Sequence, residues 1–472
     1  MASIVRLLAV ALAWTGLASL LPALVSARWG EGLAPAFLAT ALGCIFLAGA
    51  MRFASAGLGG RLRRFQVFVA LASLWVLIPL VASPVIAYAA DLPLGQAWFE
   101  ALSAFTTTGF SMVERGPRSL FAWFALLQWC GGLLTIVCAI AVLAPASIGG
   151  LPNRAAHALD AVQAVETLAA LKEVTPLYAG ATGIAFLAML LSGHGPYVAF
   201  CLASAVTSAG AHLPPEAVEA IRGGAGTRWV LMPFLLWAAT SVRWHKALVG
   251  RRIHAAPEQS ESLLLLGYWA VAGTLLAVII YRLPSIIPAG EAINSGLFAA
   301  ASLISTSGIP PEPDTYEEIP RSLQLILALV GGGALSVAAG LKIFRIRALV
   351  LRAQGDLLRL LSPNLVQPVR TGEGGVGSAM RGIWVTLLAV VCALAGVLIL
   401  MSTSMPSFEA ALTGAVAALT NTGPLYDASG ADWPPIATLP AWSMLAAAFA
   451  MVAGRLETVG LFVLLHLAVW RK

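Results

Sequence analysis

FEALSAFTTTG, residues 99–109, is the segment that best predicts the architecture, because three further segments can be superposed on its final glycine. They are FCLASAVTSAG at 200–210, FAAASLISTSG at 298–308 and TGAVAALTNTG at 413–423. All four carry a hydroxyl residue three positions before the glycine, and the first three also share a phenylalanine and a serine. The glycines are separated by 101, 98 and 115 residues. Self-similarity at a nearly fixed period is typical of a chain built from structural repeats.

The composition places these repeats in a membrane. The 472 residues are 59% hydrophobic and 11% charged, whereas a soluble domain carries about 25% charged residues. A membrane helix needs about 20 apolar residues, and the sequence predicts ten such spans, at 4–26, 33–51, 66–90, 119–146, 174–193, 227–248, 262–283, 321–344, 382–402 and 437–469. The first run, with Arg6 ahead of it and small residues at its end, also resembles a cleavable signal peptide, which is the alternative for that span.

Each glycine segment lies between two of these spans and is preceded by a proline, namely Pro93, Pro196, Pro288 or Pro406. Proline favours the first turn of a helix, where its missing N–H costs nothing. We therefore expect an all-α polytopic membrane protein with four pseudo-symmetric helix–pore helix–helix repeats around one pore, preceded by two extra transmembrane helices. The expected units are the helix pair at 1–64 and repeats at 65–146, 147–252, 253–349 and 350–472.

Charge predicts the orientation of the chain. Most of the 28 Lys and Arg fall in loops on one side, which the positive-inside rule makes cytoplasmic, with both termini there as well. The net charge of +6 is then a topology signal, and no nucleic acid partner is expected. Acids gather on the other side, including Glu312, Asp314, Glu317 and Glu318. They form either an outer mouth that concentrates cations or ordinary solvated loops.

The glycine segments have the chemistry of an ion filter. Irregular backbone at membrane depth must be buried in protein or line a wet cavity, so we expect the four loops to meet around one axis. Rings of main-chain carbonyls can replace the hydration shell of K+, and helix C-termini add partial negative charge. No carboxylate lies between the hydroxyl residue and the glycine, which disfavours divalent ions. The predicted K+-binding residues are Thr106, Thr107, Thr108, Gly109, Thr207, Ser208, Ala209, Gly210, Ser305, Thr306, Ser307, Gly308, Thr420, Asn421, Thr422 and Gly423.

The sequence resembles the TrkH/KtrB/HKT superfamily of potassium transporters, most nearly its bacterial TrkH branch, over almost the whole chain. Besides the four filter segments, the resemblance rests on QWCGG at 128–132, GGG at 331–333 with GLK at 340–342, NTGP at 421–424 and GRLE at 454–457. It implies K+ uptake across a bacterial inner (plasma) membrane by a multi-pass, non-enzymatic protein that needs no cofactor. It also implies a homodimer in membrane lipid, on a cytosolic nucleotide-binding regulatory subunit of the TrkA/KtrA kind. The gate implied by the resemblance consists of Gly331, Gly332, Gly333, Gly340, Lys342 and Arg455.

Three departures from the family pattern are visible. Residues 334–339 could stay helical, so gating could differ. Ala209 and Ala211 leave the second filter one hydroxyl short of the first. Pro424 and Leu425 follow the fourth segment, where the family often has another glycine. Relatives with Ser for the first filter glycine tend towards Na+, and this chain keeps all four glycines, which favours K+.

Alternatives remain at this stage for function and for single residues. The function alternatives are a Na+-permeable or proton-coupled transporter, a membrane-embedded enzyme, and a non-conducting sensor of the same fold. Arg455 either faces the gate, or only pairs with Glu457 or extends to the inner membrane interface. His194 and His212 are expected at the outer surface rather than as metal ligands, and the five cysteines as packing residues.

Overall fold

The computed structural model describes residues 2–57, 64–143, 163–251, 258–282, 287–312, 315–361, 376–428, 433–458 and 460. Within these ranges the chain is helical and contains no strand. Seven helical stretches are long and apolar enough to cross a membrane, and four shorter apolar helices accompany them. The expected fold class, an all-α polytopic membrane protein, is confirmed.

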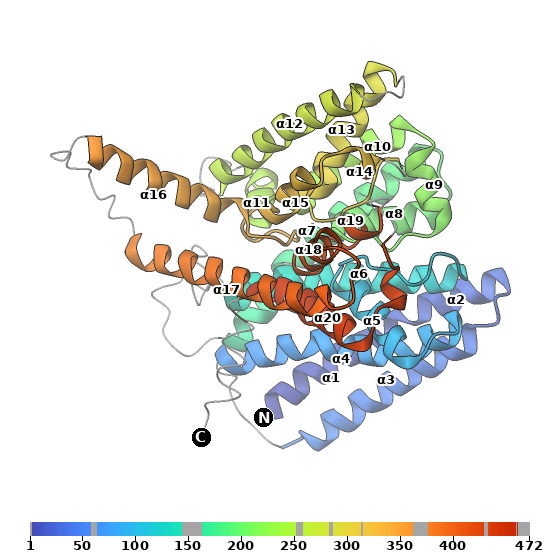
Figure 1. Cartoon of the computed structure of the whole chain (residues 1–472). Coiled ribbons are helices and arrows are strands. Elements are labelled where there is room, and N and C mark those ends of the chain that lie inside the picture. The colour runs from blue at the N-terminus through green and yellow to red at the C-terminus, as the bar shows by residue number, and fades with distance from the viewer. Residues whose placement is uncertain are drawn as a thin grey trace.

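Two helical segments precede the repeats. The first is α1 (Ala2–Ala18) continued by α2 (Leu20–Trp29), and the second is α3 (Ala34–Ala54). Gly30 ends α2 with a positive φ of 68°, a geometry that glycine reaches without a Cβ clash. Figure 1 shows α1 and α3 in blue along the lower edge of the molecule and α2 at its right-hand side. Helix α1 packs against α3 and α4, and α2 packs against α6.

Each repeat is a pore helix with one helix before it and one after it. Repeat one is α4 (Arg64–Ala90), α5 (Leu94–Phe105) and α6 (Arg118–Cys138), and repeat two is α7 (Gln163–Leu191), α8 (Pro196–Ser208) and α10 (Ala225–Ala239). Repeat three is α12 (Gln259–Tyr281), α13 (Ala289–Ile304) and α15 (Arg321–Val330), and repeat four is α17 (Val376–Ser402), α18 (Phe408–Leu419) and α20 (Ala441–Arg455). Three of the four prolines start a pore helix: Pro93 and Pro288 cap α5 and α13, and Pro196 begins α8. The fourth, Pro406, precedes the N-cap residue Ser407 of α18.

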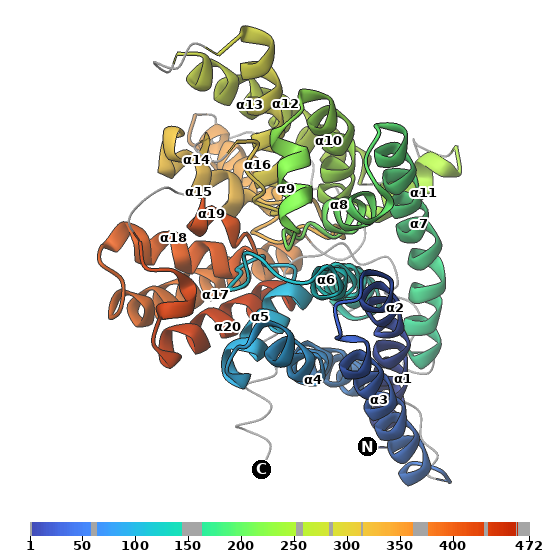
Figure 2. The same cartoon turned by 90° about the vertical axis from the view of Figure 1, so that its right-hand side faces the viewer.

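One packing rule closes the repeats into a ring. The last helix of each repeat packs against the pore helix of the next, in the pairs α6 with α8, α10 with α13, α15 with α18, and α20 with α5. Figure 2 shows the result, with the four colour groups arranged about a common centre. A chain that follows this rule four times returns to its starting point, so the four pore helices enclose one axis.

Three of the ten expected spans are not continuous helices. The span at 227–248 breaks after α10, at Thr240–Ser241, and resumes as α11 (Val242–Val249). The span at 321–344 ends with α15 at Val330, and the chain is irregular until α16 (Ile343–Leu361). The span at 437–469 contains a short 3-10 turn (Ile436–Thr438) and α20, and its residues after 458, apart from 460, lie outside the described residues. Hydropathy could not reveal these breaks, because it does not record where a backbone group hydrogen-bonds outside its own helix.

The remaining elements are short. A π-helical turn (Ala139–Leu143) extends α6, while α9 (Pro215–Arg222), α14 (Thr315–Glu318) and α19 (Pro424–Asp427) follow the second, third and fourth filter segments. The repeat boundaries at 146/147 and 252/253 lie outside the described residues, and 349/350 lies inside α16, so the boundaries stay predictions.

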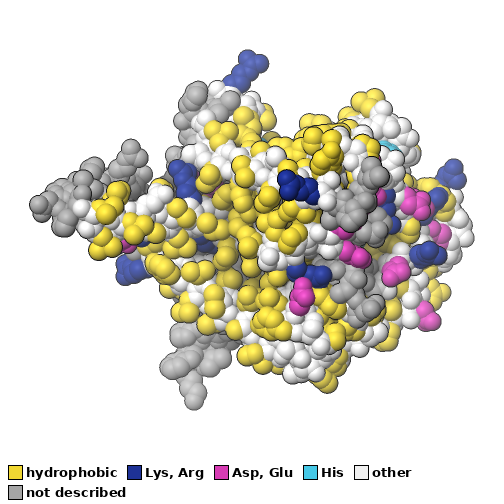
Figure 3. Space-filling view, turned by 45° about the horizontal axis from the view of Figure 1, so that its top comes forward, with side chains coloured by type: hydrophobic (Ala, Val, Ile, Leu, Met, Phe, Trp, Pro, Cys, Tyr) yellow, Lys and Arg dark blue, Asp and Glu magenta, His cyan; other side chains and the backbone are white. Residues whose placement is uncertain are grey.

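The surface separates an apolar belt from polar ends. In Figure 3 hydrophobic side chains cover the middle of the visible face, and acidic side chains gather mainly toward the right-hand end, where α9 lies in Figure 1. The exposed apolar residues include Phe46, Leu191, Val271, Leu388 and Ile399. An apolar belt of this kind suits hydrocarbon rather than water, which agrees with a multi-pass membrane protein.

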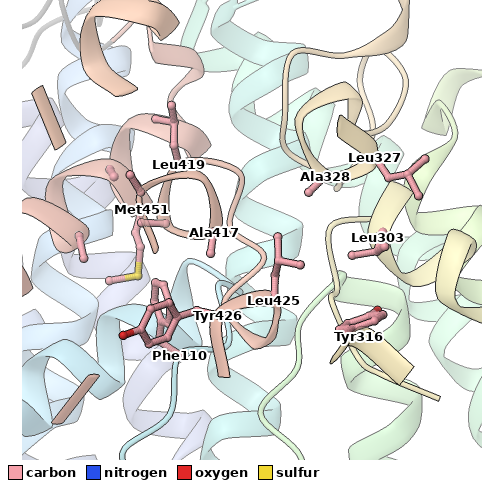
Figure 4. Close-up of a cluster of buried hydrophobic side chains, with 14 of the residues drawn as sticks. Phe110, Leu303, Tyr316, Leu327, Ala328, Ala417, Leu419, Leu425, Tyr426 and Met451 are labelled. Carbon is pink, nitrogen blue, oxygen red and sulfur yellow. The ribbon is translucent and has the colours of Figure 1, made fainter. Parts of the chain in front are cut away.

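A buried cluster fills the space between repeats three and four and the first filter loop. Figure 4 shows Phe110, Leu303, Tyr316, Leu425 and Tyr426 converging there from different segments. Phe110 and Tyr426 pack edge to face with ring centroids 6.4 Å apart. The cluster holds the outer loops of repeats three and four against repeat one.

Candidate functional site

Every pore helix ends in the same backbone motif. A residue with positive φ follows the helix: Thr107 (53°), Ala209 (54°), Thr306 (61°) and Asn421 (53°). The N–H of the next residue then bonds five residues back, from Thr108 to Ser103, Gly210 to Ala205, Ser307 to Ser302 and Thr422 to Ala417, at 2.8, 2.9, 3.0 and 2.8 Å. This is the Schellman arrangement, which satisfies carbonyls that a helix end leaves unpaired. Each helix therefore stops abruptly and turns its chain back outwards.

The motif corrects the sequence register in repeat two. The glycine follows the motif in repeats one, three and four, but Gly210 is itself part of it. In structure, Gly210 therefore matches Thr108, and Ala211 matches Gly109. Superposition on the glycines cannot detect this shift, because the one-residue extension of α8 is decided by the backbone hydrogen bonds of Ala209 and Gly210.

The four filter segments contact one another in a closed ring. The N–H of Gly423 donates to the carbonyl of Thr108 (2.6 Å), and the Asn421 amide donates to Thr108 Oγ1 (2.9 Å). Ser307 Oγ donates to the Gly210 carbonyl (2.9 Å). A Cβ added to Gly109 would lie 2.8 Å from the Ala211 Cβ, and one added to Gly308 would lie 2.8 Å from Thr422 Cγ2. Neighbouring repeats therefore touch in all four pairs, and the predicted site residues of each segment lie together.

Glycine is required at this ring for two different reasons. Gly109 and Gly308 have positive φ, at 87° and 74°. Gly423 has an ordinary helical φ, but a Cβ there would lie 2.3 Å from the Phe110 nitrogen. Gly109 and Gly308 are needed for their left-handed backbone conformation, whereas Gly423 is needed because repeats one and four approach closely there.

The side-chain hydroxyls of the segments mostly bond back to their own pore helices. Thr106 Oγ1 donates to Leu102 O (2.7 Å), Thr207 Oγ1 to Ala203 O (2.8 Å) and Thr420 Oγ1 to Val416 O (2.8 Å). The oxygens that remain for an ion are therefore chiefly main-chain carbonyls. Those of Thr106, Thr108 and Gly210 already accept a bond from protein, and a carbonyl has a second lone pair to offer.

The irregular segment between α15 and α16, residues 331–342, lies directly beneath the ring. The expectation that 334–339 could stay helical is wrong: Gly331 and Gly340 have φ of 63° and 84°, and Leu335 has φ of 53°. A Cβ on Gly331 would lie 2.1 Å from the Ala339 carbonyl, so the two ends of this loop approach too closely for a side chain. The Ala339 N–H donates to Thr306 Oγ1 of the third filter segment (3.0 Å). We call residues 331–342 the repeat-three loop.

The break after α10 is where this loop is held. A helix end leaves its last carbonyls unpaired, and here the Ala239 carbonyl accepts from Gly333 N (2.7 Å) while the Ala238 carbonyl accepts from Val337 N (3.1 Å). In return the Val242 N–H donates to the Leu335 carbonyl (3.2 Å). The helix interruptions in repeat two and repeat three thus form hydrogen bonds to each other's unpaired backbone groups.

Arg455 connects the ring to the repeat-three loop. Its side chain is 2% exposed, its Nε donates to the Thr106 carbonyl (2.5 Å), its Nη1 donates to the Val337 carbonyl (2.6 Å), and its Nη2 bonds Thr107 Oγ1. The alternative that Arg455 pairs with Glu457 is wrong, because Glu457 accepts from Arg345 instead. Guanidinium donors have a fixed planar fork, so the three bonds fix the loop relative to the first filter segment.

Further charged groups brace the loop from the inner side. Lys342 Nζ donates to the carbonyls of Ala338 (3.1 Å) and Gly333 (3.4 Å), and it lies 4.0 Å from Glu457 Oε1. The Ala334 N–H donates to the Glu261 carboxylate on α12. Next to the fourth segment, beside Thr420 and Gly340, lies a cavity of about 20 Å³. That is room for about one water.

The outer side of the ring is open. A cavity of about 410 Å³ lies there, and it is lined by residues that follow the second, third and fourth filter segments, including Ala211, Ile309 and Pro424. Glu317 and Asp427 line it together with Arg222. Glu312 instead pairs with the buried Arg228, and Asp314 lies outside the described residues. The predicted acidic mouth thus has fewer free carboxylates than its sequence suggested.

Two polar residues at the outer edge were missed or misplaced by sequence reasoning. Glu100, on α5, is fully buried and accepts hydrogen bonds from Ser111 and Met112, although nothing in its sequence position distinguishes it. His212 was expected at the surface but is 2% exposed, with its ring against Phe124 at 5.2 Å between centroids.

His194 is half-buried and bonds Thr227. Of the cysteines, Cys44, Cys138 and Cys201 are buried, whereas Cys392 is exposed.

The architecture defines a class: a polytopic membrane protein of four helix–pore helix–helix repeats whose filter loops form one ring above an intramembrane loop. Within this class the chain is similar to the potassium transporter TrkH from Vibrio parahaemolyticus. The crystal structure of that protein superposes with a TM-score of 0.86, at 23% sequence identity, covering 100% of this chain and 99% of that one.

Sequence comparison gives the same relatives. The chain is 28% identical over 423 residues to the Trk system potassium uptake protein TrkI of Halomonas elongata, covering 87% of this chain and 85% of TrkI. It is 24% identical over 468 residues to TrkH of Escherichia coli K12, covering 96% of each. No family model matches the chain. The resemblance to the TrkH/KtrB/HKT superfamily, and within it to the TrkH branch, is confirmed.

Proposed function

We propose that the protein takes up K+ across the inner (plasma) membrane of a bacterium through the ring of four filter loops. The observation that carries this proposal is the ring itself: four pore helices end in the same motif, and their loops touch in all four neighbouring pairs. The C-terminal ends of the four helices bring partial negative charge to the same place. The relatives in the comparisons are potassium uptake proteins, which makes a transporter the function to test rather than an enzyme.

The proposed ion ligands are main-chain oxygens of 106–109, 207–210, 305–308 and 420–423. Ala211 is added because it occupies the position of Gly109 in repeat two. K+ would lose its water at the ring and be held by carbonyls, as in other potassium filters. An inside-negative membrane potential contributes about 2.3 kcal/mol per 100 mV for each charge, so uptake requires no covalent chemistry on this chain.

The proposed gate is the repeat-three loop, with Gly331, Gly332, Gly333, Gly340 and Lys342, held by Arg455. The loop lies under the third filter segment and is bonded to it, to α10 and to Arg455. For ions to pass, the loop must move and break these bonds. The proposed assembly is a homodimer. A cytosolic nucleotide-binding subunit of the TrkA/KtrA kind is proposed to move the loop. The termini would then both be cytoplasmic.

The test is growth rescue of a bacterium that lacks K+ uptake, on medium with low K+. The wild-type chain should restore growth. Gly109→Ser should not, because φ at Gly109 is 87° and its Cβ would lie 2.8 Å from Ala211. The matched control is Gly95→Ala, on the pore helix that precedes Gly109, where a Cβ meets nothing within 4 Å. Failure of the wild-type chain to rescue, at normal membrane abundance, would overturn the proposal and favour a non-conducting sensor.

A Na+-permeable or proton-coupled transporter is the second candidate. The observation in its favour is the one-residue register shift in repeat two, which puts Ala211 where the other filters have glycine. Flux of K+ and Na+ into proteoliposomes, each measured at two external pH values, distinguishes a K+-selective, a Na+-permeable and a proton-coupled transporter. Equal K+ and Na+ flux would remove the K+ assignment, and flux that follows the proton gradient would indicate coupling.

A further inference from the structure

Glu100 is an acid buried beside the filter of repeat one alone. It lies on α5, nine residues before Gly109, and its side chain is 0% exposed. In the structural register the matching positions of the other three segments are Leu202, Ala299 and Gly414, none of which carries an ionisable side chain. The fourfold pattern therefore does not explain why repeat one carries a carboxylate here.

The carboxylate of Glu100 holds the chain just beyond the first filter segment. Its Oε1 accepts a hydrogen bond from Ser111 Oγ (2.8 Å), and its Oε2 accepts one from the Met112 N–H (2.8 Å). Both donors follow Gly109 within three residues. The two bonds fix where the chain leaves the ring, and hence how the last carbonyls of the segment are aimed.

The same network reaches the second filter segment. His212, two residues after Gly210, has its Nε2 3.4 Å from Glu100 Oε1, and neither side chain is exposed. Gln128 of α6 bonds the main chain of His212 in both directions, donating to its carbonyl (3.2 Å) and accepting from its N–H (3.3 Å). Glu100 and Gln128, both from repeat one, therefore position the outer ends of two neighbouring filter segments.

Burial makes the charge of Glu100 effective. A carboxylate away from water is costly unless hydrogen bonds satisfy it, and two of the three contacts described here do so. Away from solvent and salt, its field is screened far less than that of a surface acid. A cation in the ring would experience this charge more strongly than the charges of exposed acids at the mouth.

We infer that Glu100 is a positioning residue for ion selectivity: it fixes the outer carbonyls of repeats one and two and favours a bound monovalent cation by its buried charge. Ser111 and His212 contribute to selectivity through their contacts with the Glu100 carboxylate. The inference rests on the proposed transport function, and goes beyond it by assigning selectivity to a side chain outside the ring of main-chain oxygens.

The test uses the full chain in proteoliposomes, with initial K+ and Na+ flux measured over a range of concentrations. Glu100→Gln keeps the shape of the side chain and removes its charge. We expect its K+/Na+ flux ratio to fall about tenfold, with a raised apparent KM for K+, because a charge-assisted hydrogen bond is worth about twice a neutral one. Ser111→Ala and His212→Gln each remove one contact and leave the carboxylate, so we expect a drop of about threefold in the same ratio.

The matched control is Glu409→Gln. Glu409 lies in the first turn of the pore helix α18, is 58% exposed and pairs with Arg321. Its loss should leave the flux ratio and KM unchanged. Without K+ flux in the wild-type chain, the proposed function itself fails. If the wild-type flux is selective, an unchanged K+/Na+ flux ratio in Glu100→Gln overturns the inference. If Glu100→Gln does not reach the membrane, unchanged K+/Na+ flux ratios in both Ser111→Ala and His212→Gln overturn it.

Discussion

Single residues at the ring are chosen by backbone geometry rather than by side-chain chemistry. Four residues with a Cβ, among them Thr107 and Asn421, adopt left-handed geometry where a pore helix ends. Such residues cost free energy that the surroundings must supply, and the hydrogen bonds of the Schellman motif supply it. The glycines next to them then allow the loops to touch.

Gly423→Ala tests the contact between repeats one and four. The new Cβ would lie 2.3 Å from Phe110 N and 2.6 Å from the Gly109 carbonyl carbon. Overpacking of this kind costs about 1–3 kcal/mol, so we expect a lower melting temperature in detergent and loss of most K+ uptake. Gly95→Ala should match the wild-type chain in both measurements. Normal uptake by Gly423→Ala would mean that this contact is not needed for conduction.

Arg455→Gln tests the link between the ring and the repeat-three loop. The change removes the donors to the Thr106 and Val337 carbonyls. We expect the loop to open more often, seen as faster amide hydrogen exchange at 331–340 and as greater K+ flux in the absence of any regulator. The control is Arg352→Gln, since Arg352 is an exposed residue of α16 paired with Asp356. Unchanged exchange in Arg455→Gln would show that Arg455 does not hold the loop.

At the level of elements, the interrupted helices work as a pair. The break at Thr240–Ser241 frees the carbonyls of Ala238 and Ala239, and the repeat-three loop uses them. Thr240 keeps the break in place, because its Oγ1 donates to the Leu236 carbonyl (2.8 Å) and contacts His245 Nε2 (2.7 Å). His245 in turn stacks on Trp237, with ring centroids 5.0 Å apart. The observed position of the loop thus depends on repeat two as well as on Arg455.

Thr240→Val removes these side-chain bonds at nearly constant volume. We expect α10 and α11 to join more readily, the carbonyls of Ala238 and Ala239 to be used within the helix, and amides 331–340 to exchange faster. Thr274→Val is the matched control, because Thr274 Oγ1 makes only the equivalent bond to Ala270 within the exposed face of α12. Slower or unchanged loop exchange in Thr240→Val would contradict this role of the helix break.

At the level of the whole molecule, charge and packing give one orientation. The mouth with α9 carries Glu317 and Asp427, while α16, at the other end, carries Arg345, Arg347 and Arg352. In the proposed topology α16 lies in the cytoplasm, as the positive-inside rule favours. The repeat-three loop then faces inwards and the cavity at the mouth faces outwards.

Cysteine labelling tests this orientation. In a chain whose own cysteines are replaced by alanine or serine, Glu219→Cys on α9 should react with a membrane-impermeant maleimide added to intact cells. Gln354→Cys on α16 should react only after the cells are opened. Both positions are exposed in the structure, so access is not limited by packing. The reverse labelling pattern would invert the proposed topology.

The sequence predicted the fold well because its main determinants are local. Apolar length indicates a span, proline favours the start of a pore helix, and the repeated hydroxyl and glycine indicate where each pore helix ends. The prediction of continuous helices was wrong for the three interrupted spans, because hydropathy does not record where a backbone hydrogen bond is made to another repeat. Burial of His212, pairing of Glu312 with Arg228, and the partners of Arg455 were missed for the same reason.

By itself, then, the sequence determined that four similar units span a membrane and that each carries a loop at the same place. Only the tertiary structure decided the register of repeat two, the irregular course of residues 331–342, and the burial of Glu100 behind the first filter. The physical reason is that unpaired backbone groups and buried charges must find partners inside the protein. Partners such as His212 for Glu100, or Ala238 for the repeat-three loop, lie about 100 residues away along the chain, and that proximity exists only after the ring has closed.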